Sequence, residues 1–171
     1  MKIDPKTISV YDRRHQDYKN MKKSEAENQL LQKFAIKLPN NGTVLDYGCG
    51  PGDSAAYFAT CGLISHAFDA SIEMVKIANK QKGVRAWQSS FDDFRSENIY
   101  DGIWANFSLL HAERKDMPNL LSCIHKGLKL RGLFHIAMKL GYGSARDKIG
   151  RQYTYFEKNE LDELLQSAGF T

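Results

Sequence analysis

The pattern of apolar and polar positions first predicts a helix in the N-terminal quarter of the chain. Ser24 and Glu27 have the spacing of a capping box, which marks a helix start. Apolar residues then recur on one helical face at Leu30, Leu31, Phe34 and Leu38. Pro39 ends the pattern, and an Asn-Asn-Gly turn follows.

Beyond that turn, short apolar runs alternate with segments of helical spacing. The runs that predict strands are residues 43–46, 63–69, 84–87, 100–105 and 133–138. The segments that predict helices are one ending near Gly62, then 71–83, 117–129 and 157–168, with Gly169 as the final cap. Nearly continuous apolar strands between helices are typical of a parallel sheet covered on both faces. We therefore expect an α/β fold with a doubly wound, Rossmann-like, mostly parallel sheet.

Length and composition predict one domain. The chain has 171 residues, of which 42% are hydrophobic and 26% charged, as in ordinary domains with one core. We expect a single domain over residues 1–171, with a helical cap at 1–40 and the Rossmann-like core at 41–171. Residues 141–150 hold three glycines, and we interpret them as a functional loop beside the site rather than a linker.

The charge pattern argues against a nucleic-acid partner. The 24 basic and 20 acidic residues give a net charge of +4, and both signs are interspersed. The one local excess, Lys19 with Lys22 and Lys23, predicts a solvated face.

The cysteines and the N-terminus favour a cytoplasmic protein. Cys49, Cys61 and Cys123 form no CxxC pair and are odd in number, which supports neither a disulfide framework nor a zinc site. We expect no metal. No apolar run resembles a signal peptide or a membrane span, so no membrane partner is expected.

The strongest chemical signal is a glycine cluster between the first strand and the next helix. Residues 44–52 read VLDYGCGPG, with Gly48, Gly50 and Gly52 at every second position. Glycine lets the backbone turn sharply and approach a ligand closely, and the N-terminus of the following helix suits a carboxylate or phosphate. A tight turn without a ligand is the alternative.

An acid on the neighbouring strand weighs against that alternative. Asp69 ends the second strand, 17 residues beyond Gly52, where it can accept hydrogen bonds from both hydroxyls of a ribose. Together the two features favour a ligand that contains adenosine.

The residues around the glycines separate a dinucleotide from S-adenosylmethionine. Asp53 stands where a dinucleotide fingerprint needs its third glycine, and a carboxylate there would repel a pyrophosphate. Asp46 can engage the α-ammonium of a methionine moiety. A nicotinamide-dependent oxidoreductase is thus disfavoured, and a non-catalytic S-adenosylmethionine-binding partner or regulatory protein stays open as an alternative.

These residues resemble the first motif of the class I S-adenosylmethionine-dependent methyltransferase family. The resemblance runs from Tyr11 to Phe170 and is closest to small-molecule members of the tellurite- and thiopurine-like or "type 11/12" groups. It implies strand order 3-2-1-4-5, S-adenosylmethionine as cofactor with S-adenosylhomocysteine as product, and in-line methyl transfer to a small-molecule acceptor.

The resemblance also implies the site residues. The cofactor-binding set is Asp46, Gly48, Cys49, Gly50 and Gly52 at the methionine end, Asp69 at the ribose, Ala70, Ser71, Met74, Ser90 and Phe91 at the adenosine, Asn106 and Phe107 towards the acceptor, and Tyr11 and Tyr18 closing over the cofactor carboxylate. Ser90 departs from the acid that the family usually has there. His111, Arg151 and Tyr153 are candidate acceptor contacts, with His111 interpreted as a loop tether rather than a base. The catalytic group stays unassigned.

Two departures from the family concern the fifth strand. Residues 129–133 replace a Lys-Pro-Gly-Gly turn, so we expect a non-glycine residue in the left-handed region at a cost of roughly 1 to 2 kcal/mol. The family has two further strands after the last helix, so the sequence ending at Thr171 predicts a truncated seven-strand fold or a minimal five-stranded one. We expect a second copy of the chain, as a homodimer, or a folded-back segment to cover the exposed edge.

Overall fold

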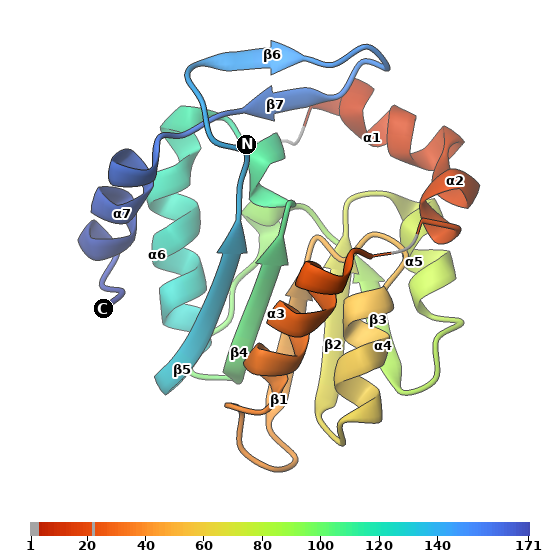
Figure 1. Cartoon of the computed structure of the whole chain (residues 1–171), viewed down its shortest axis with the longest axis vertical. Coiled ribbons are helices and arrows are strands. Elements are labelled where there is room, and N and C mark those ends of the chain that lie inside the picture. The colour runs from red at the N-terminus through yellow and green to blue at the C-terminus, as the bar shows by residue number, and fades with distance from the viewer. Residues whose placement is uncertain (1–3, 22) are drawn as a thin grey trace.

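The computed structural model describes residues 4–21 and 23–171, built around one parallel sheet (Figure 1). The strands are β1 (Thr43–Tyr47), β2 (Ile64–Asp69), β3 (Val84–Gln88), β4 (Tyr100–Asn106) and β5 (Leu128–Ala137). Every neighbouring pair is parallel, and the order is β3-β2-β1-β4-β5. The α/β class and the strand order expected from the sequence are confirmed.

Helices cover both faces of the sheet. On one face lie α3 (Glu25–Ala35), α4 (Asp53–Thr60) and α5 (Ile72–Ala78), and on the other α6 (Met117–Gly127) and α7 (Lys158–Ser167). In the described residues, short 3-10 helices lie in the connections: η1 (Phe91–Asp93), η2 (Leu109–His111) and η3 (Arg114–Asp116). The carboxyl ends of the parallel strands meet at one edge of the sheet, which is where α/β folds bind ligands.

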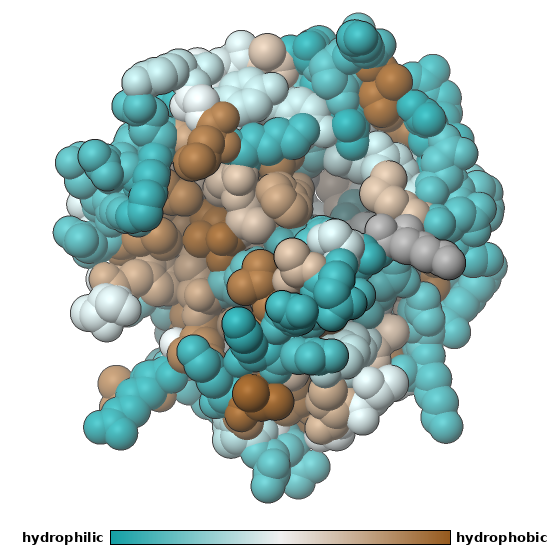
Figure 2. All heavy atoms as spheres, viewed as in Figure 1, coloured by the Kyte–Doolittle hydropathy of each residue, from teal (hydrophilic) through white to brown (hydrophobic). Residues whose placement is uncertain are grey.

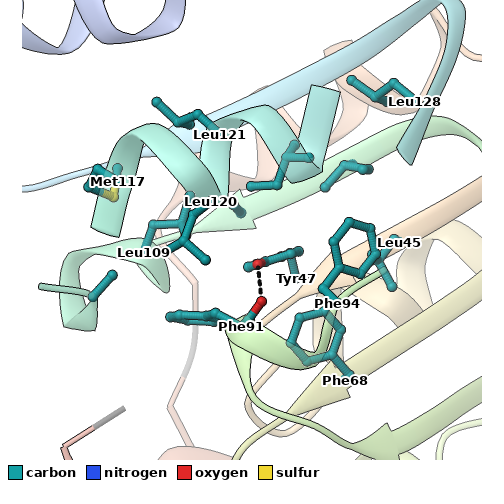
Figure 3. Close-up of a cluster of buried hydrophobic side chains, with 14 of the residues drawn as sticks. Leu45, Tyr47, Phe68, Phe91, Phe94, Leu109, Met117, Leu120, Leu121 and Leu128 are labelled. Atoms are coloured by element: carbon teal, nitrogen blue, oxygen red, sulfur yellow. Dashed lines mark hydrogen bonds between the residues drawn. The ribbon is translucent and has the colours of Figure 1, made fainter. Parts of the chain in front are cut away.

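The core follows from the alternation of side chains along the strands. Leu45 and Tyr47 of β1 point into the cluster under α6, while Val44 packs with α3 and α4. Figure 3 shows the first cluster, in which the Tyr47 hydroxyl donates to the carbonyl of Phe91 at 3.3 Å. The Tyr47 and Phe91 rings stack with centroids 5.1 Å apart. This contact anchors the connection after β3 beneath the site.

The capping signals in the sequence mark real helix starts. The Ser24 backbone N–H donates to Glu27 Oε2 at 2.8 Å, and the Glu27 N–H donates to Ser24 Oγ at 3.3 Å, which completes the capping box of α3. Ser71 Oγ likewise accepts the N–H of Met74 at the start of α5.

Two elements lie over the carboxyl ends of the strands (Figure 1). One is the N-terminal pair α1 (Pro5–Arg13) and α2 (His15–Lys19). The other is an antiparallel hairpin, β6 (Ser144–Arg146) and β7 (Gln152–Thr154), so residues 144–146 of the expected loop form a strand. We call these two elements together the roof.

Side chains from the two ends of the chain hold the roof together. Arg146 Nη1 donates to Asp4 Oδ2 at 2.8 Å, and the Gln152 N–H donates to Thr7 Oγ1 at 2.8 Å. Asp4 also caps α1 by accepting the N–H of Thr7 at 2.8 Å. One carboxylate therefore both starts the helix and attaches it to the hairpin.

The edge strand β5 begins at Leu128, earlier than the predicted Leu133. Its pairing with β4 shifts register between Tyr100 and Gly102, and Arg131 has φ 64° at this irregularity. The predicted left-handed, non-glycine residue is thus confirmed.

No strand pairs with the outer edge of β5 in the part of the chain that the structure describes. The hairpin forms a sheet of its own, so it is not the expected covering segment. Leu130 is 94% exposed, and apolar residues gather over the β5 side of the molecule (Figure 2). Among helices in the two described ranges, none has the length and apolar character needed to cross a membrane.

Candidate functional site

A cavity of 310 Å³ lies at the carboxyl ends of β1, β2 and β4, beneath the roof. Its floor comes from the residues that end these strands, and its walls from α1, α2 and the hairpin. The strand order reverses between β1 and β4, and α/β sheets bind ligands at such a point.

The glycine loop forms the floor, and two of its glycines are required by geometry. Gly48 has φ 75°, and a Cβ there would lie 2.5 Å from Ser108 Cβ. Gly50 has φ 52°, and a Cβ there would meet no atom within 4 Å. Gly48 is therefore needed for close packing, whereas Gly50 leaves open space into which a ligand can approach the backbone.

Asp69 joins the end of β2 to the glycine loop. Its Oδ2 accepts the N–H of Gly50 and its Oδ1 accepts the N–H of Ser71, both at 2.9 Å. Burial raises the pKa of this carboxyl despite these bonds. Each carboxylate oxygen can accept a second hydrogen bond, so a diol can still bind at Asp69.

Asp46 and Lys23 form a charged corner on the other side of the loop. Asp46 is 4% exposed, accepts the Ala55 N–H at 3.2 Å, and has its pKa raised to about 7 by burial. Lys23 Nζ donates to Ser54 Oγ at 2.5 Å, and its pKa is lowered by burial. The expectation of a solvated face is wrong for Lys23, because the side chain lines the cavity; Lys22 lies outside the described residues.

The residues after β2 and β3 form the wall beyond Asp69. Ala70, Ser71 and Phe91 line the cavity. Ser71 Oγ donates to Asp12 Oδ1 at 2.5 Å, which connects α1 to this wall.

The residues after β4 carry backbone strain. Phe107 has φ 55°, its N–H donates to the carbonyl of Ala137 at 3.1 Å, and its side chain is 43% exposed. A non-glycine residue in this region costs free energy that the surrounding structure must offset, and such positions cluster at functional sites. Ser108, which the sequence did not single out, lines the cavity and is 5% exposed, and its hydroxyl has no partner in the described ranges.

The hairpin side of the cavity is lined by tyrosines around one guanidinium group. Arg151 Nη1 donates to the Tyr18 hydroxyl at 2.6 Å and to the Tyr11 hydroxyl at 3.5 Å. Its other side pairs with Asp147 at 2.7 Å. The guanidinium carbon also lies 5.2 Å from the ring centroid of Tyr153. Arg151 thus fixes three aromatic side chains of the cavity wall.

His111 connects this cluster to the hairpin backbone. Its Nδ1 lies 2.6 Å from the carbonyl oxygen of Gln152, so Nδ1 carries the hydrogen and donates. Its Nε2 lies 2.7 Å from the Tyr11 hydroxyl oxygen and accepts a hydrogen bond from that hydroxyl. Burial lowers the pKa of His111 to about 4, so the imidazole is neutral and holds Tyr11 in place.

The structure brings most of the expected site residues to this one cavity. Those that line it are Asp46, Gly48, Cys49, Gly50, Asp69, Ala70, Ser71, Phe91, Asn106, Phe107, Tyr11, Tyr18, His111, Arg151 and Tyr153. Gly52, Met74 and Ser90 are not part of the lining. A Cβ on Gly52 would lie 2.7 Å from Ala78 Cβ, Met74 is 1% exposed in the core, and Ser90 caps η1 through Asp93.

The sequence prediction missed further residues that line the cavity, which come from the N-terminal segment, the glycine loop and α4, and the connections after β4 and β5. They are Thr7, Ile8, Met21, Lys23, Glu27, Pro51, Asp53, Ser54, Ser108, Leu110 and Lys139. The Asp4-Pro5 pair, an N-cap followed by proline at the first helical position, is a helix-start signal that could have located α1.

Comparison with known families agrees with this geometry. Residues 13–171 match the family described as a methyltransferase domain. The chain belongs to this family, and its sheet and glycine loop are those of a class I S-adenosylmethionine-dependent methyltransferase. A search of curated proteins found no match.

Solved structures show the same fold. Burkholderia thailandensis 1,6-didemethyltoxoflavin-N1-methyltransferase, crystallised with 1,6-didemethyltoxoflavin and S-adenosylhomocysteine, is 26% identical with a TM-score of 0.81 over 98% of this chain and 77% of that one. The DhpI complex with S-adenosylhomocysteine is 18% identical with a TM-score of 0.71 over 98% and 88%. A TehB-like methyltransferase from Corynebacterium glutamicum is 17% identical with a TM-score of 0.68 over 97% and 84%.

Proposed function

We propose that the chain, as a single domain over residues 1–171, transfers a methyl group from S-adenosylmethionine to a small molecule, with both held in the cavity beneath the roof. The observation that carries the proposal is the junction of Gly50 and Asp69. An open backbone position and a carboxylate with free lone pairs lie side by side there, bonded at 2.9 Å. Such a junction suits a nucleoside with one end on the loop and its ribose on the acid.

The chemistry of the cavity fits this cofactor. The carboxylate of Asp46 suits an α-ammonium, and the neighbouring Lys23 suits an α-carboxylate. Ala70, Ser71 and Phe91 offer small and apolar surface to an adenosine. One ligand would thus lie along the floor of the cavity, with its methionine end near α3, its ribose at the end of β2 and its base near the end of β3.

The protein's contribution to the reaction is alignment. S-adenosylmethionine supplies a methyl group on a sulfonium, which becomes a neutral thioether when the methyl leaves. The strained segment at Asn106 and Phe107, with the tyrosines of the roof, would hold the acceptor atom in line, at about 3 to 3.5 Å from the methyl carbon.

A small acceptor is supported by the size and enclosure of the cavity. Tyr11, Tyr18 and Tyr153 close its outer wall, and Arg151 fixes them. The Burkholderia thailandensis relative acts on a small heterocycle, 1,6-didemethyltoxoflavin, within the same fold. The acceptor of this chain would bind between the tyrosines and Phe107.

Calorimetry with S-adenosylhomocysteine on the purified protein tests the proposal. We expect saturable binding with one site, and no competition from NAD. An absence of binding, or displacement by NAD, would contradict it. An acceptor screen with S-adenosylmethionine then distinguishes an enzyme from a binding protein, because only the enzyme forms S-adenosylhomocysteine.

We also propose that the outer edge of β5 pairs with a second copy of the chain. The edge has no covering strand within the described residues, and Leu130 on it is 94% exposed. Sedimentation should give a dimer, and Leu130→Lys should shift it towards the monomer. A monomer at all concentrations would refute the pairing.

A cytoplasmic location is proposed from the cysteines. Cys49, Cys61 and Cys123 are all free thiols, as expected in a reducing compartment. Fluorescence microscopy of a tagged chain in its own host would test it.

A further inference from the structure

The charged groups of the cavity are separated by sign. Asp46, Asp53 and Asp69 line the glycine-loop side, where Lys23 is the one cation in the lining. Lys139 and Arg151 line the hairpin side. The acidic side suits a cofactor with a positive sulfonium and ammonium, whereas cations at the other side would repel that sulfonium unless a negative group lay between them.

Of the two cations on the hairpin side of the cavity, Lys139 is the one whose charge is not paired with a carboxylate of the described residues. Arg151 is paired with Asp147 at 2.7 Å. Lys139 Nζ lies 4.0 Å from the ring centroid of Tyr153, and in residues 4–21 and 23–171 no carboxylate pairs with it. Lys139 and Arg151 both lower the pKa of His111, which places their charges on the same side of the cavity as that imidazole. This side therefore has a net charge of about one positive unit.

The same side offers no group that takes a proton near neutral pH. His111 Nδ1 already donates to Gln152, and burial lowers the pKa of the imidazole to about 4. Burial raises the pKa of Tyr11, and that of Tyr153 to about 12, so neither is a phenolate. Glu27, on the α3 side, has its pKa lowered by hydrogen bonds with Ser24. An acceptor on the hairpin side that must lose a proton during transfer finds no base beside it.

We propose that the acceptor is a planar organic acid that binds as its anion, with its negative charge against Lys139 and its ring among Tyr11, Tyr18 and Tyr153. This inference rests on the proposed function. A lone pair of the anion attacks the methyl carbon, the carbon–sulfur bond breaks, and its electron pair stays on sulfur. A monoanion and a sulfonium give a neutral methylated product and a thioether, and no proton has to move.

The test uses matched pairs of ligands on protein saturated with S-adenosylhomocysteine. Benzoate and benzamide, nicotinate and nicotinamide, and 2-naphthoate and 2-naphthamide differ in charge but little in shape. Ligand-observed NMR titrations give the dissociation constant of each on the wild type, on Lys139→Met and on Lys148→Met. Lys148 lies in the loop of the hairpin, is exposed and does not line the cavity, so it is the control lysine.

We expect the wild type to bind at least one acid about tenfold more tightly than its amide, a difference of about 1.4 kcal/mol in binding free energy. Lys139→Met should abolish that preference without changing amide binding, and Lys148→Met should retain it. No preference in any of the pairs, or a preference that survives Lys139→Met, overturns the inference. Failure of S-adenosylhomocysteine to bind in the first place would instead overturn the proposed function.

Discussion

The backbone N–H of Gly50 donates to the carboxylate of Asp69 at 2.9 Å, although 19 positions separate the two residues in the chain. The bond holds the tip of the glycine loop against the end of β2. The acid thus positions the loop and also presents its remaining lone pairs to the cavity. Both roles can be separated by experiment.

Replacing Asp69 by alanine should weaken the binding of S-adenosylhomocysteine by about 1.5 to 3 kcal/mol, which is the range for hydrogen bonds to a charged group. Calorimetry measures the change, with circular dichroism to verify that the variant is folded. Glu163→Ala, an exposed acid on α7, is the control and should bind normally. An unchanged dissociation constant in Asp69→Ala would remove this residue from the site.

Substitutions at two glycines with similar backbone geometry can separate an effect on stability from an effect on ligand binding. Gly50 has φ 52° and Gly143 has φ 66°, and a Cβ on either would meet no atom within 4 Å. Alanine at each should therefore lower the free energy of unfolding by a similar amount, about 1 to 2 kcal/mol. Only Gly50→Ala should weaken the binding of S-adenosylhomocysteine, since of the two glycines only Gly50 lines the cavity. Equal binding by both variants would show that no ligand approaches Gly50.

Asp46 should couple cofactor binding to proton release. Its pKa is raised to about 7, so near neutral pH part of the protein carries a protonated acid. An α-ammonium beside it favours the carboxylate and lowers that pKa, so binding releases protons and the affinity rises as the pH increases towards 7.

Calorimetry in buffers of different ionisation enthalpy measures the protons released. Asp46→Asn keeps the size of the side chain but cannot titrate, and it should release fewer protons than the wild type. If both proteins released the same number of protons on binding, the α-ammonium of the cofactor would not lie beside Asp46.

His111 should make stability depend on pH. Its pKa is about 4 in the folded protein, against about 6.5 for a histidine in the unfolded chain, so the unfolded chain takes up the proton first. Stability is therefore full above pH 6.5 and falls as the pH decreases towards 4, by at most about 3 kcal/mol from this residue.

Urea unfolding over this pH range checks the histidine effect. His111→Gln should reduce the slope of stability against pH by up to about one proton. His135, whose pKa burial also lowers to about 4, should give a similar reduction when changed to glutamine. Slopes equal to that of the wild type in both variants would contradict the assigned neutral state.

The elements that could be predicted from the sequence are those whose signals are local. The capping box at Ser24, the glycine spacing at Gly48 and Gly50, and the apolar strands each depend on a few neighbouring residues. The strand order followed from the family resemblance that these signals supported. The site floor lies on the ends of those strands, so it could be predicted with them.

The hairpin and α2 could not be predicted in the same way. The strands β6 and β7 have three residues each, too few to show a period of two, and α2 has five. Lys23 and Lys139 reach the cavity only because tertiary contacts bring their segments to it. A charge pattern along the chain cannot distinguish such lysines from solvated ones, as the wrong expectation for Lys23 shows.

The bond between Asp4 and Arg146 joins positions 142 apart in the chain. During synthesis, the sheet and its glycine loop can pair before the hairpin has left the ribosome, but this bond cannot. A nascent chain would thus have the nucleoside-binding floor of the cavity but not yet the roof that covers it. Closing so long a loop is entropically costly, and segments attached in this way are among the first to open. Ligand capture should therefore be lost at denaturant concentrations that leave the sheet intact.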